Sequence, residues 1–171
     1  MSELQRFTTE YVELEDRIRL SGETAPGEAE VLWLTQRLIG RLVPHLCAWL
    51  ERQGGLGAVP EDPSVADALQ GFALQAALQS LSPQPPVQPE TARRNWLVHA
   101  VDVTAGEEAL RLAFRGAEAA RVELTLQPQA LRQWLGILHA QCRGAEWPLE
   151  AWPSWLSGPI AGGAPHVQML H

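Results

Sequence analysis

Two stretches of this sequence, 92 residues apart, show the same succession of hydrophobic patterns. In each stretch, the alternation typical of β-strands gives way to the three- and four-residue spacing of an amphipathic helix. Aligned without gaps, Ile18 falls on Leu110 and Leu34 falls on Leu126. Apolar helical positions also coincide, with Ile39, Leu42, Val43 and Leu46 falling on Leu131, Trp134, Leu135 and Leu138. Such a repeat indicates two units of three strands and one helix, which would share one sheet around a pseudo-two-fold axis.

The repeat predicts an α+β fold built on one antiparallel sheet of about six strands. Its two βββα units cover about residues 7–52 and 95–143. The helix of each unit, near 35–52 and 128–143, would cover one face of the sheet. Pro44 falls well inside the first helix, where it removes a backbone hydrogen bond, so we expect a kink or a break there. The first helix should end at Gly54 and Gly55.

Strands are expected where the alternation of apolar residues is clearest. A loop containing Gly and Pro is expected over 21–27. Both faces of 96–103 are largely apolar, which is typical of a central strand. The expected strands are 7–14, 17–20 and 31–34 in the first unit and 96–103, 110–114 and 122–126 in the second.

The segment between the two units predicts one further helix and a stiff connector. Asp62 followed by Pro63 is typical of a helix start, which places this inserted helix at about 63–81. Its apolar positions are broad because alanines are frequent, so we expect it to be buried on more than one side. Several prolines then predict an extended connector over 82–91.

The length and composition predict one domain over residues 1–157, because 171 residues with 46% hydrophobic content suffice for one core. Residues 158–171 are rich in Gly and Pro and are expected to form a flexible tail. The longest apolar run is far shorter than the roughly 20 residues of a membrane helix. The first residues lack the basic and apolar regions of a signal peptide. We therefore expect a bacterial protein of the cytoplasm with no membrane span.

All 13 basic residues are arginines. A chain without lysine cannot form a Schiff base or a lysine-containing phosphate loop. The formal net charge of -7 opposes binding to nucleic acid phosphates, so nucleic acid is not an expected partner.

The segment after the last helix contains three tryptophans, Trp147, Trp152 and Trp155, interleaved with prolines. Tryptophan is among the residues that most often dominate the energy of protein interfaces. The segment therefore predicts an interaction surface. The alternative is that these side chains fold back and cap the core of the domain itself.

A second candidate site combines His99, His139 and Cys142 as ligands of a metal or groups of a small enzyme. His139 and Cys142 are three residues apart on one helical face, so both could face one ion. The alternative is that the histidines are buried in ordinary hydrogen-bonded positions. Cys47 and Cys142 are then buried thiols, as is usual for isolated cysteines in a chain without a secretion signal.

A third candidate is an anion-binding face formed by Arg19 and Arg111, which occupy equivalent positions of the repeat. Alternation places both on the solvent side of the sheet, where pairing with neighbouring glutamates is the alternative.

No motif specifies a reaction, and no cofactor is expected. We therefore predict a non-enzymatic protein that acts through protein–protein contacts, as a homodimer or as an accessory subunit bound to a protein partner. The rival prediction is a small metal- or ligand-binding enzyme with its site near His99, His139 and Cys142.

Overall fold

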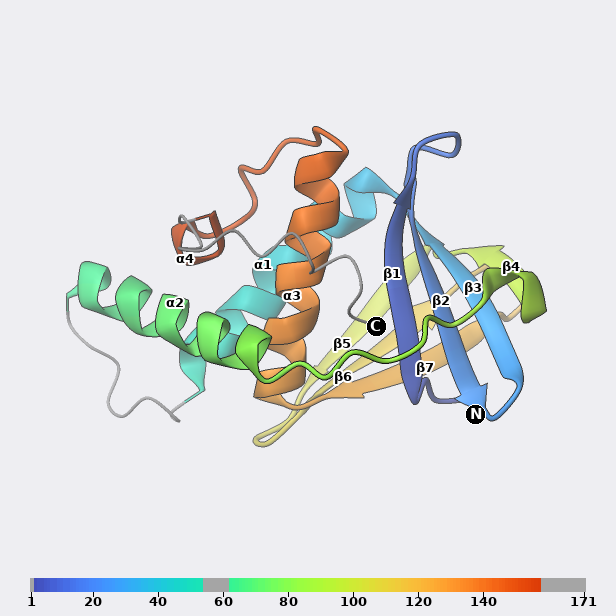
Figure 1. Ribbon diagram of the computed structural model, residues 1–171, viewed down its shortest axis with the longest axis horizontal. Helices are drawn as coiled ribbons and strands as arrows, with labels where there is room; N and C mark the ends of the chain where they lie inside the picture. Colours follow the sequence, from blue (N-terminus) through green and yellow to red (C-terminus); the bar gives the residue numbers. More distant parts are fainter. Residues whose placement is uncertain (1, 54–61, 158–171) are drawn as a thin grey trace.

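The computed structural model describes residues 2–53 and 62–157, and over these residues the chain forms an α+β fold of seven strands and four α-helices (Figure 1). The predicted flexible tail at 158–171 lies outside the described residues, as do Gly54 and Gly55, where the first helix is predicted to end. Within the described ranges, no helix has the length and apolar character that crossing a membrane requires.

The strands form two sheets instead of the single sheet that the repeat predicts. All neighbouring strands are antiparallel except β3 and β4, which run parallel. The first sheet, in the order β1-β2-β3-β4, contains β1 (Arg6–Val12), β2 (Arg17–Ala25), β3 (Glu28–Leu34) and β4 (Ala92–Leu97). The second sheet, in the order β5-β6-β7, contains β5 (Ala100–Ala105), β6 (Leu110–Arg115) and β7 (Arg121–Leu126).

The sheets separate within the segment that alternation predicts to be one strand, 96–103. The Val98 amide donates to the Trp33 carbonyl of β3 at 3.0 Å, and the next amide, of His99, donates to the Arg115 carbonyl of β6 at 2.7 Å. Two adjacent residues are thus bonded to different sheets. The predicted strand is divided into β4 and β5, and the chain passes from one sheet to the other between them.

A second junction between the sheets lies near the N-terminus. The Leu4 amide donates to the Glu123 carbonyl of β7 at 2.8 Å, and the Gln5 amide donates to the Glu23 carbonyl of β2 at 2.9 Å. The two sheets are therefore joined at both ends and curve around one interior, which contains a single cluster of buried hydrophobic residues.

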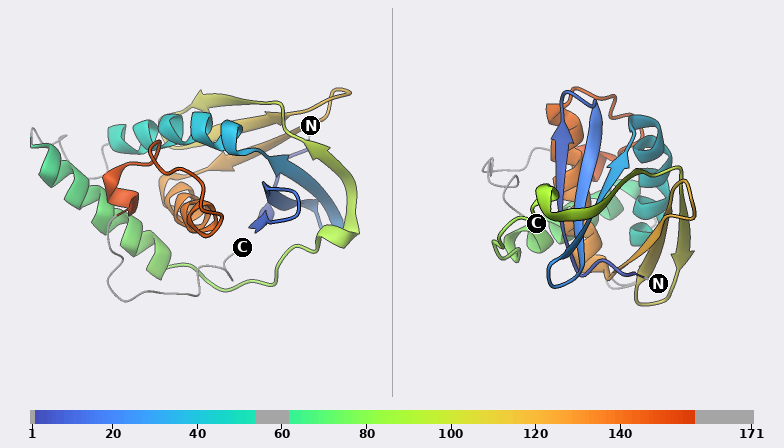
Figure 2. Two further views of the ribbon diagram at one scale, coloured as in Figure 1. Left: turned by 90° about the horizontal axis from the view of Figure 1, so that it is seen from above. Right: turned by 90° about the vertical axis from the view of Figure 1, so that its right-hand side faces the viewer.

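Helices α1 (Gln36–Arg52) and α3 (Pro128–Gly144) supply the helical part of this interior. Figure 2 shows α3 end-on, with α1 and α2 on different sides of it. Thr35 caps α1 as a side-chain acceptor for the Leu38 amide at 3.2 Å. The expected break at Pro44 does not occur, because the carbonyl that loses its partner belongs to Gly40, which is exposed and can be hydrated.

The two helices have the same length and begin 92 residues apart. The hairpins that precede them share the same offset and register, since Ile18 pairs with Leu34 in β2 and β3 and Leu110 pairs with Leu126 in β6 and β7. The first strand of each unit does not follow the offset, because β1 is shifted by two residues against β2 relative to β5 against β6. A pseudo-two-fold axis remains a prediction.

The loop predicted over 21–27 is largely strand. β2 continues to Ala25, and Gly27 makes the turn into β3 with a φ of 79°, the left-handed region that favours glycine. Gly22 lies within β2 and does not end it. The absence of a side chain at this position leaves room for Leu4, which lies against the strand.

Helix α2 (Pro63–Gln79) begins where the sequence predicts, with the Asp62 carboxylate accepting from the Ser64 amide at 2.9 Å. It packs beside α3 and near α4 (Ser154–Ser157). The expectation that it is buried on more than one side is wrong, because its buried residues, Gln70, Leu74 and Ala77, lie on one side.

The connector from 82 to 91 lies across the outer face of the first sheet (Figure 1). It contains no strand, and it ends in a short 3-10 helix, η2 (Pro89–Thr91). Val87 is buried there, and its amide donates to the Thr8 hydroxyl of β1 at 2.9 Å. Arg6 donates to the Pro85 carbonyl. The connector therefore covers part of the sheet, in addition to linking the two units.

Packing at the junction between the sheets depends on Gly116. A Cβ atom at this position would lie 2.4 Å from the Trp96 ring and 2.9 Å from the Leu97 carbonyl oxygen, both of which would have to move. We expect Gly116→Ala to lower the free energy of unfolding by about 1–3 kcal/mol in urea denaturation. The control is Gly40→Ala, on the exposed side of α1, where a Cβ meets nothing within 4 Å. The control should raise stability by up to about 1 kcal/mol. Unchanged stability of Gly116→Ala would contradict the packing described here.

Candidate interaction groove between helix α1 and strand β5

A groove of about 440 Å³ separates the N-terminal half of α1 from β5. Apolar side chains come from both walls, and the charged or titratable side chains are an arginine and two histidines, with no carboxylate among them. The groove is lined by Leu38, Arg41, Leu42 and His45 of α1 and by His99, Ala100, Val101 and Val103. The chain as a whole has a formal net charge of -7, but the lining of this groove combines apolar side chains with basic ones.

The α1 wall is one strip of the helix, because its four residues recur at three- and four-residue spacing. Leu42 is buried at the base, whereas Arg41 and His45 are exposed at the rim. Seven other arginines of the described chain are ion-paired with carboxylates, but Arg41 has no carboxylate partner within the described residues. Its charge is available to a ligand.

The β5 wall is formed by Val101 and Val103. Both point toward the interior, because their partners in β6, Phe114 and Leu112, are core residues. Val103 nevertheless remains 37% exposed. Asp102, between them, lies on the outer face and accepts from Arg115 at 2.7 Å. The expectation that segment 96–103 is a central strand is wrong, because β4 and β5 are each an edge strand of their sheet.

The backbone of β5 is paired on one side only. Its one neighbour in the sheet is β6. The Gly106 amide donates to the Ala109 carbonyl at 3.0 Å, and hydrogen-bonded pairs alternate along an antiparallel ladder. The backbone N–H and C=O groups of Val101 and Val103 therefore point away from β6, toward the unpaired edge. An edge of this kind can accept another strand.

The corresponding space in the first unit, between β1 and α3, is narrowed by aromatic side chains to a hollow of about 280 Å³ beside Phe7. Phe7 packs edge to face on Trp134, with ring centroids 5.9 Å apart, and Tyr11 packs in the same way on Trp147 at 5.6 Å. The Trp134 Nε1 group donates to the Thr9 hydroxyl at 3.1 Å. The short side chains of Val101 and Val103 on β5 make no such contacts with α1.

The edge of β1 is also closed by α3. The Tyr11 amide donates to the Gln141 side-chain oxygen at 2.8 Å, so the helix supplies the acceptor that a neighbouring strand would supply. Helix α1 makes its comparable contact at the far end of β5, where the Trp49 Nε1 group donates to the Gly106 carbonyl at 3.1 Å. The groove therefore stays open toward His99.

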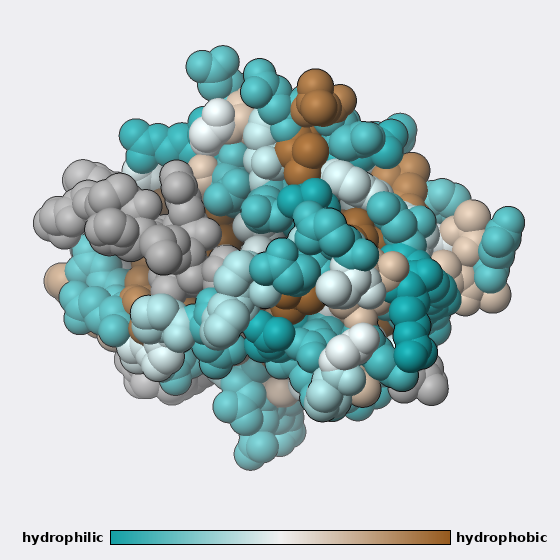
Figure 3. All heavy atoms as spheres, turned by 45° about the vertical axis from the view of Figure 1, so that its right-hand side comes forward, coloured by the Kyte–Doolittle hydropathy of each residue, from teal (hydrophilic) through white to brown (hydrophobic). Residues whose placement is uncertain are grey.

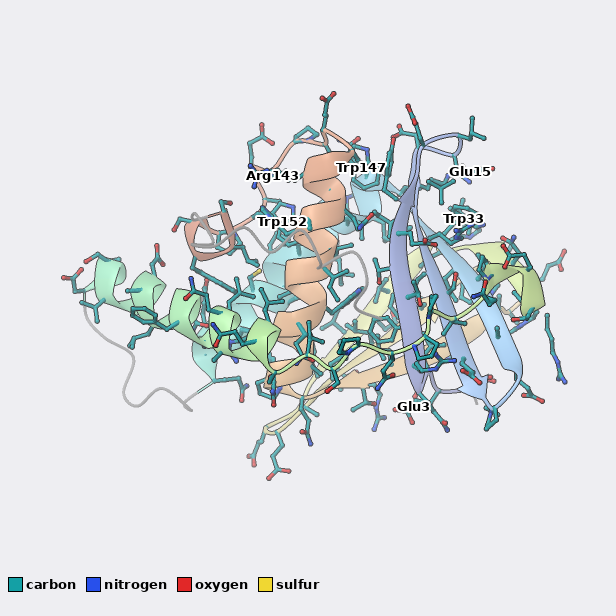
Figure 4. All side chains as sticks on the ribbon, viewed as in Figure 1. Glu3, Glu15, Trp33, Arg143, Trp147 and Trp152 are labelled. Atoms are coloured by element: carbon teal, nitrogen blue, oxygen red, sulfur yellow. The ribbon has the colours of Figure 1, made fainter. Side chains whose placement is uncertain are left out.

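The three tryptophans of the first predicted site pack against the domain itself. Trp147 and Trp152 lie beside the C-terminal end of α3 (Figure 4), and together with Trp155 they are at most 7% exposed. The Trp147 Nε1 group donates to Asp16, and the Trp155 Nε1 group donates to Glu51, both at 3.0 Å. Their role in binding a partner stays a prediction, but most of their surface is used within the chain.

The residues of the second predicted site lie in two places. His99 is exposed and lines the groove, whereas His139 and Cys142 are buried on α3. The His139 ring packs edge to face on Trp152, with centroids 5.1 Å apart. Burial raises the pKa of the Cys142 thiol to about 12. Cys47 is likewise a free, buried thiol. Over residues 2–53 and 62–157, no three His, Cys, Asp or Glu side chains are grouped so that they could hold a metal ion.

The two arginines of the third predicted site lie in different sheets. Arg19 is ion-paired with Glu10 at 2.6 Å, and its guanidinium carbon lies 6.0 Å from the centre of the Trp33 ring. Arg111 is exposed on β6. The face of the molecule seen in Figure 3 is largely hydrophilic, with apolar residues in small separate patches. An anion-binding role for the two arginines stays a prediction.

The sequence indicates His99 as a candidate residue but does not indicate the residues that share its groove. Arg41 and His45 lie on the polar side of α1, four residues apart, which is a common pattern of a solvated helix. One pattern in the sequence could have indicated the groove. It is the basic pair on the helix together with the short, β-branched residues Val101 and Val103, whose place in the sheet the sequence does not determine.

Comparisons of the chain with known protein families, with curated proteins and with solved structures find no match. Function is therefore inferred from the geometry of this chain alone.

The buried His139 makes stability depend on pH. Burial, and secondarily the charge of Arg143, lower the pKa of His139 below its ordinary value of 6.5, and its buried Nε2 has no hydrogen-bond partner. The unfolded chain therefore binds this proton more readily than the folded chain, so stability is complete above pH 6.5 and falls as the pH drops below that value. We expect urea titrations from about pH 7.5 to pH 5 to show this loss and His139→Gln to reduce its slope. Equal slopes in wild type and His139→Gln would refute the assignment.

Proposed function

We propose that this chain acts through protein–protein contacts and binds an extended segment of a partner protein in the groove between α1 and β5. The observation that carries the proposal is the unpaired edge of β5 beside an open groove into which Val101 and Val103 point. In strand addition, the backbone of a ligand pairs with such an edge, while alternate side chains enter the adjoining pockets. The groove offers both parts of this arrangement.

The lining of the groove favours a ligand with apolar and acidic side chains. Leu38, Leu42 and the two valines offer an apolar floor, and Arg41 stands at the rim without a carboxylate partner among the described residues. An acidic side chain at the rim would pair with Arg41, and that attraction weakens as salt is added. Basic segments would be disfavoured at the same place.

The 92-residue offset supports this choice of surface. We infer that the two units are versions of one βββα pattern, in which the space between strand and helix is about 280 Å³ in the first unit and about 440 Å³ in the second. The four α1 residues that line the groove have counterparts at this offset on α3, and these counterparts, Ala130, Gln133, Trp134 and Ile137, line a second hollow beside Phe7. Trp134 donates a hydrogen bond to β1 across that space, whereas its counterpart Leu42 has no polar side-chain atom with which to bond to β5.

The rival prediction, a metal- or ligand-binding enzyme, has no such support. It requires His99 to act together with His139 and Cys142, but His99 lies on the groove, whereas the other two are buried on α3 near Trp152 and Trp147.

The proposal predicts selective binding of acidic, strand-forming peptides. The probe is a fluorescent ten-residue peptide in which valine and glutamate alternate, compared with one in which valine and arginine alternate. Fluorescence anisotropy should show at least about tenfold tighter binding of the glutamate peptide, equivalent to about 1.4 kcal/mol, and this difference should shrink at high salt.

Two substitutions on one strand separate groove binding from a general charge effect. Val103→Glu introduces a carboxylate into the groove and should abolish binding of the glutamate peptide. The matched control Thr104→Glu places the same charge on the outer face of β5 and should leave binding nearly unchanged. Val103→Pro should also prevent binding, because proline lacks the backbone N–H that points to the unpaired edge of β5. The hydrogen bonds between β5 and β6 do not use this N–H and should remain. Equal effects of the two glutamates, or equal affinity for both peptides, would show that the groove is not the site.

A further inference from the structure

The turn between β1 and β2 presents the most exposed large apolar side chain of the described residues. Leu14 is fully exposed, and the exposed carboxylates of Glu13 and Glu15 flank it. Figure 1 shows this turn projecting from the end of the first sheet, and Glu15 is labelled there in Figure 4. Polar and small residues usually occupy such turns. A single exposed leucine is common on protein surfaces, so its meaning depends on what surrounds it and on what it fits.

Hydrogen bonds hold the turn in one conformation. The Asp16 amide donates to the Glu13 carbonyl at 3.2 Å, and Asp16 has a φ of 49°. The Asp16 carboxylate accepts from the Tyr11 hydroxyl at 2.8 Å and from the Trp147 Nε1 group at 3.0 Å. Leu14 is therefore presented at a fixed place, and a partner that binds it loses little conformational entropy in ordering the turn.

The charges of the turn complement those of the groove between α1 and β5. Glu13 has no ion-pair partner among the described residues, and Glu15 reaches Arg17 only at 3.9 Å. Arg41, at the rim of the groove, likewise has no carboxylate partner there. The turn offers an apolar side chain between carboxylates, and the groove offers an apolar floor beside a guanidinium group.

We propose that the β1–β2 turn of one copy of this chain occupies the α1–β5 groove of a second copy. Leu14 then lies on the apolar floor, and Glu13 and Glu15 lie beside Arg41. The inference rests on the proposed function, because it names the partner of the same groove. The turn belongs to another copy because the residues that line the groove come from α1 and from 99–103, and the bonds of Asp16 hold a chain's own turn elsewhere.

The sequence of the turn identifies a second copy as the partner. The lining of the groove favours a ligand with apolar and acidic side chains, and residues 12–15 read Val-Glu-Leu-Glu. Among the large hydrophobic residues exposed within 2–53 and 62–157, Leu14 is the one with an acidic residue on both sides. Every copy of the chain therefore carries both the groove and a segment with the properties that the groove selects.

The contact joins two different surfaces, so one contact leaves a turn and a groove free. A single turn in a groove buries less than the roughly 1,200–2,000 Å² of a standard stable interface. We expect a reversible association that grows with protein concentration and weakens as salt is added.

Sedimentation of the full chain from micromolar to millimolar concentration tests the proposal. The mean mass should rise above 18.8 kDa. Leu14→Ser should weaken the association by at least about tenfold, with an unchanged circular dichroism spectrum because the side chain is exposed. The matched control is Phe72→Ser, which removes a 67% exposed apolar side chain from α2 and should associate as the wild type does. A wild-type chain that stays monomeric, or an equal loss in Phe72→Ser, overturns the proposal.

Mixing two defective variants tests whether the turn meets the groove. Leu14→Ser keeps an intact groove, and Arg41→Glu keeps an intact turn but places a carboxylate at the rim. Both positions are exposed, so both variants should fold. Each variant alone should stay monomeric, whereas the mixture should form a dimer of twice 18.8 kDa through one turn and one groove. A mixture that stays monomeric contradicts the contact.

The peptide in which valine and glutamate alternate separates this inference from the proposed function. Leu14→Ser should bind that peptide with wild-type affinity, and excess peptide should return the associated wild type to 18.8 kDa. A wild type that binds the peptide but stays associated when saturated with it overturns the contact between copies and leaves peptide binding in place. A wild type that neither binds the peptide nor associates overturns both proposals.

Discussion

The neighbouring amides of Val98 and His99 donate to different sheets, and the rest of the architecture depends on this switch. A backbone amide in the interior needs an acceptor, so the chain can leave β3 only where β6 already offers one. The switch brings the two sheets around a single core that contains α1 and α3. It also determines which edge stays free, because β4 is paired with β3 before the crossing and β5 is paired with β6 after it.

Local patterns predicted the parts of the fold whose causes are local. Both long interior helices and the two hairpins lie where periodicity places them, and Asp62 caps α2 as expected. The division of 96–103 into two strands has no local sign, because the residues before and after Val98 alternate alike. The same limit applies to the site. His99 was selected with the buried pair on α3 as its companions, whereas tertiary packing places it beside Arg41 and His45.

The two units use similar elements to opposite effect. In the first unit, Tyr11 and Trp134 occupy part of the space between strand and helix, and Gln141 accepts from one amide of the strand edge. In the second unit, valines stand at the strand and basic side chains stand at the helix rim, so the space is hollow. Side chains of larger or smaller size, together with a two-residue difference in strand register, thus separate the narrower space of the first unit from the wider space of the second.

The pairing of the N-terminal segment with β7 affects how the chain can reach this fold. The Glu123 amide donates to the Ser2 carbonyl at 2.9 Å, and β3 pairs with β4, more than fifty residues after it. Neither sequence unit therefore contains all the strand partners it needs, and a chain divided at the connector would separate β4 from β3 and the N-terminal segment from β7. Contacts between residues so distant along the chain raise the contact order, and the entropy of closing large loops slows folding. During synthesis, the N-terminal residues must wait for β7 to emerge before their pairing is complete.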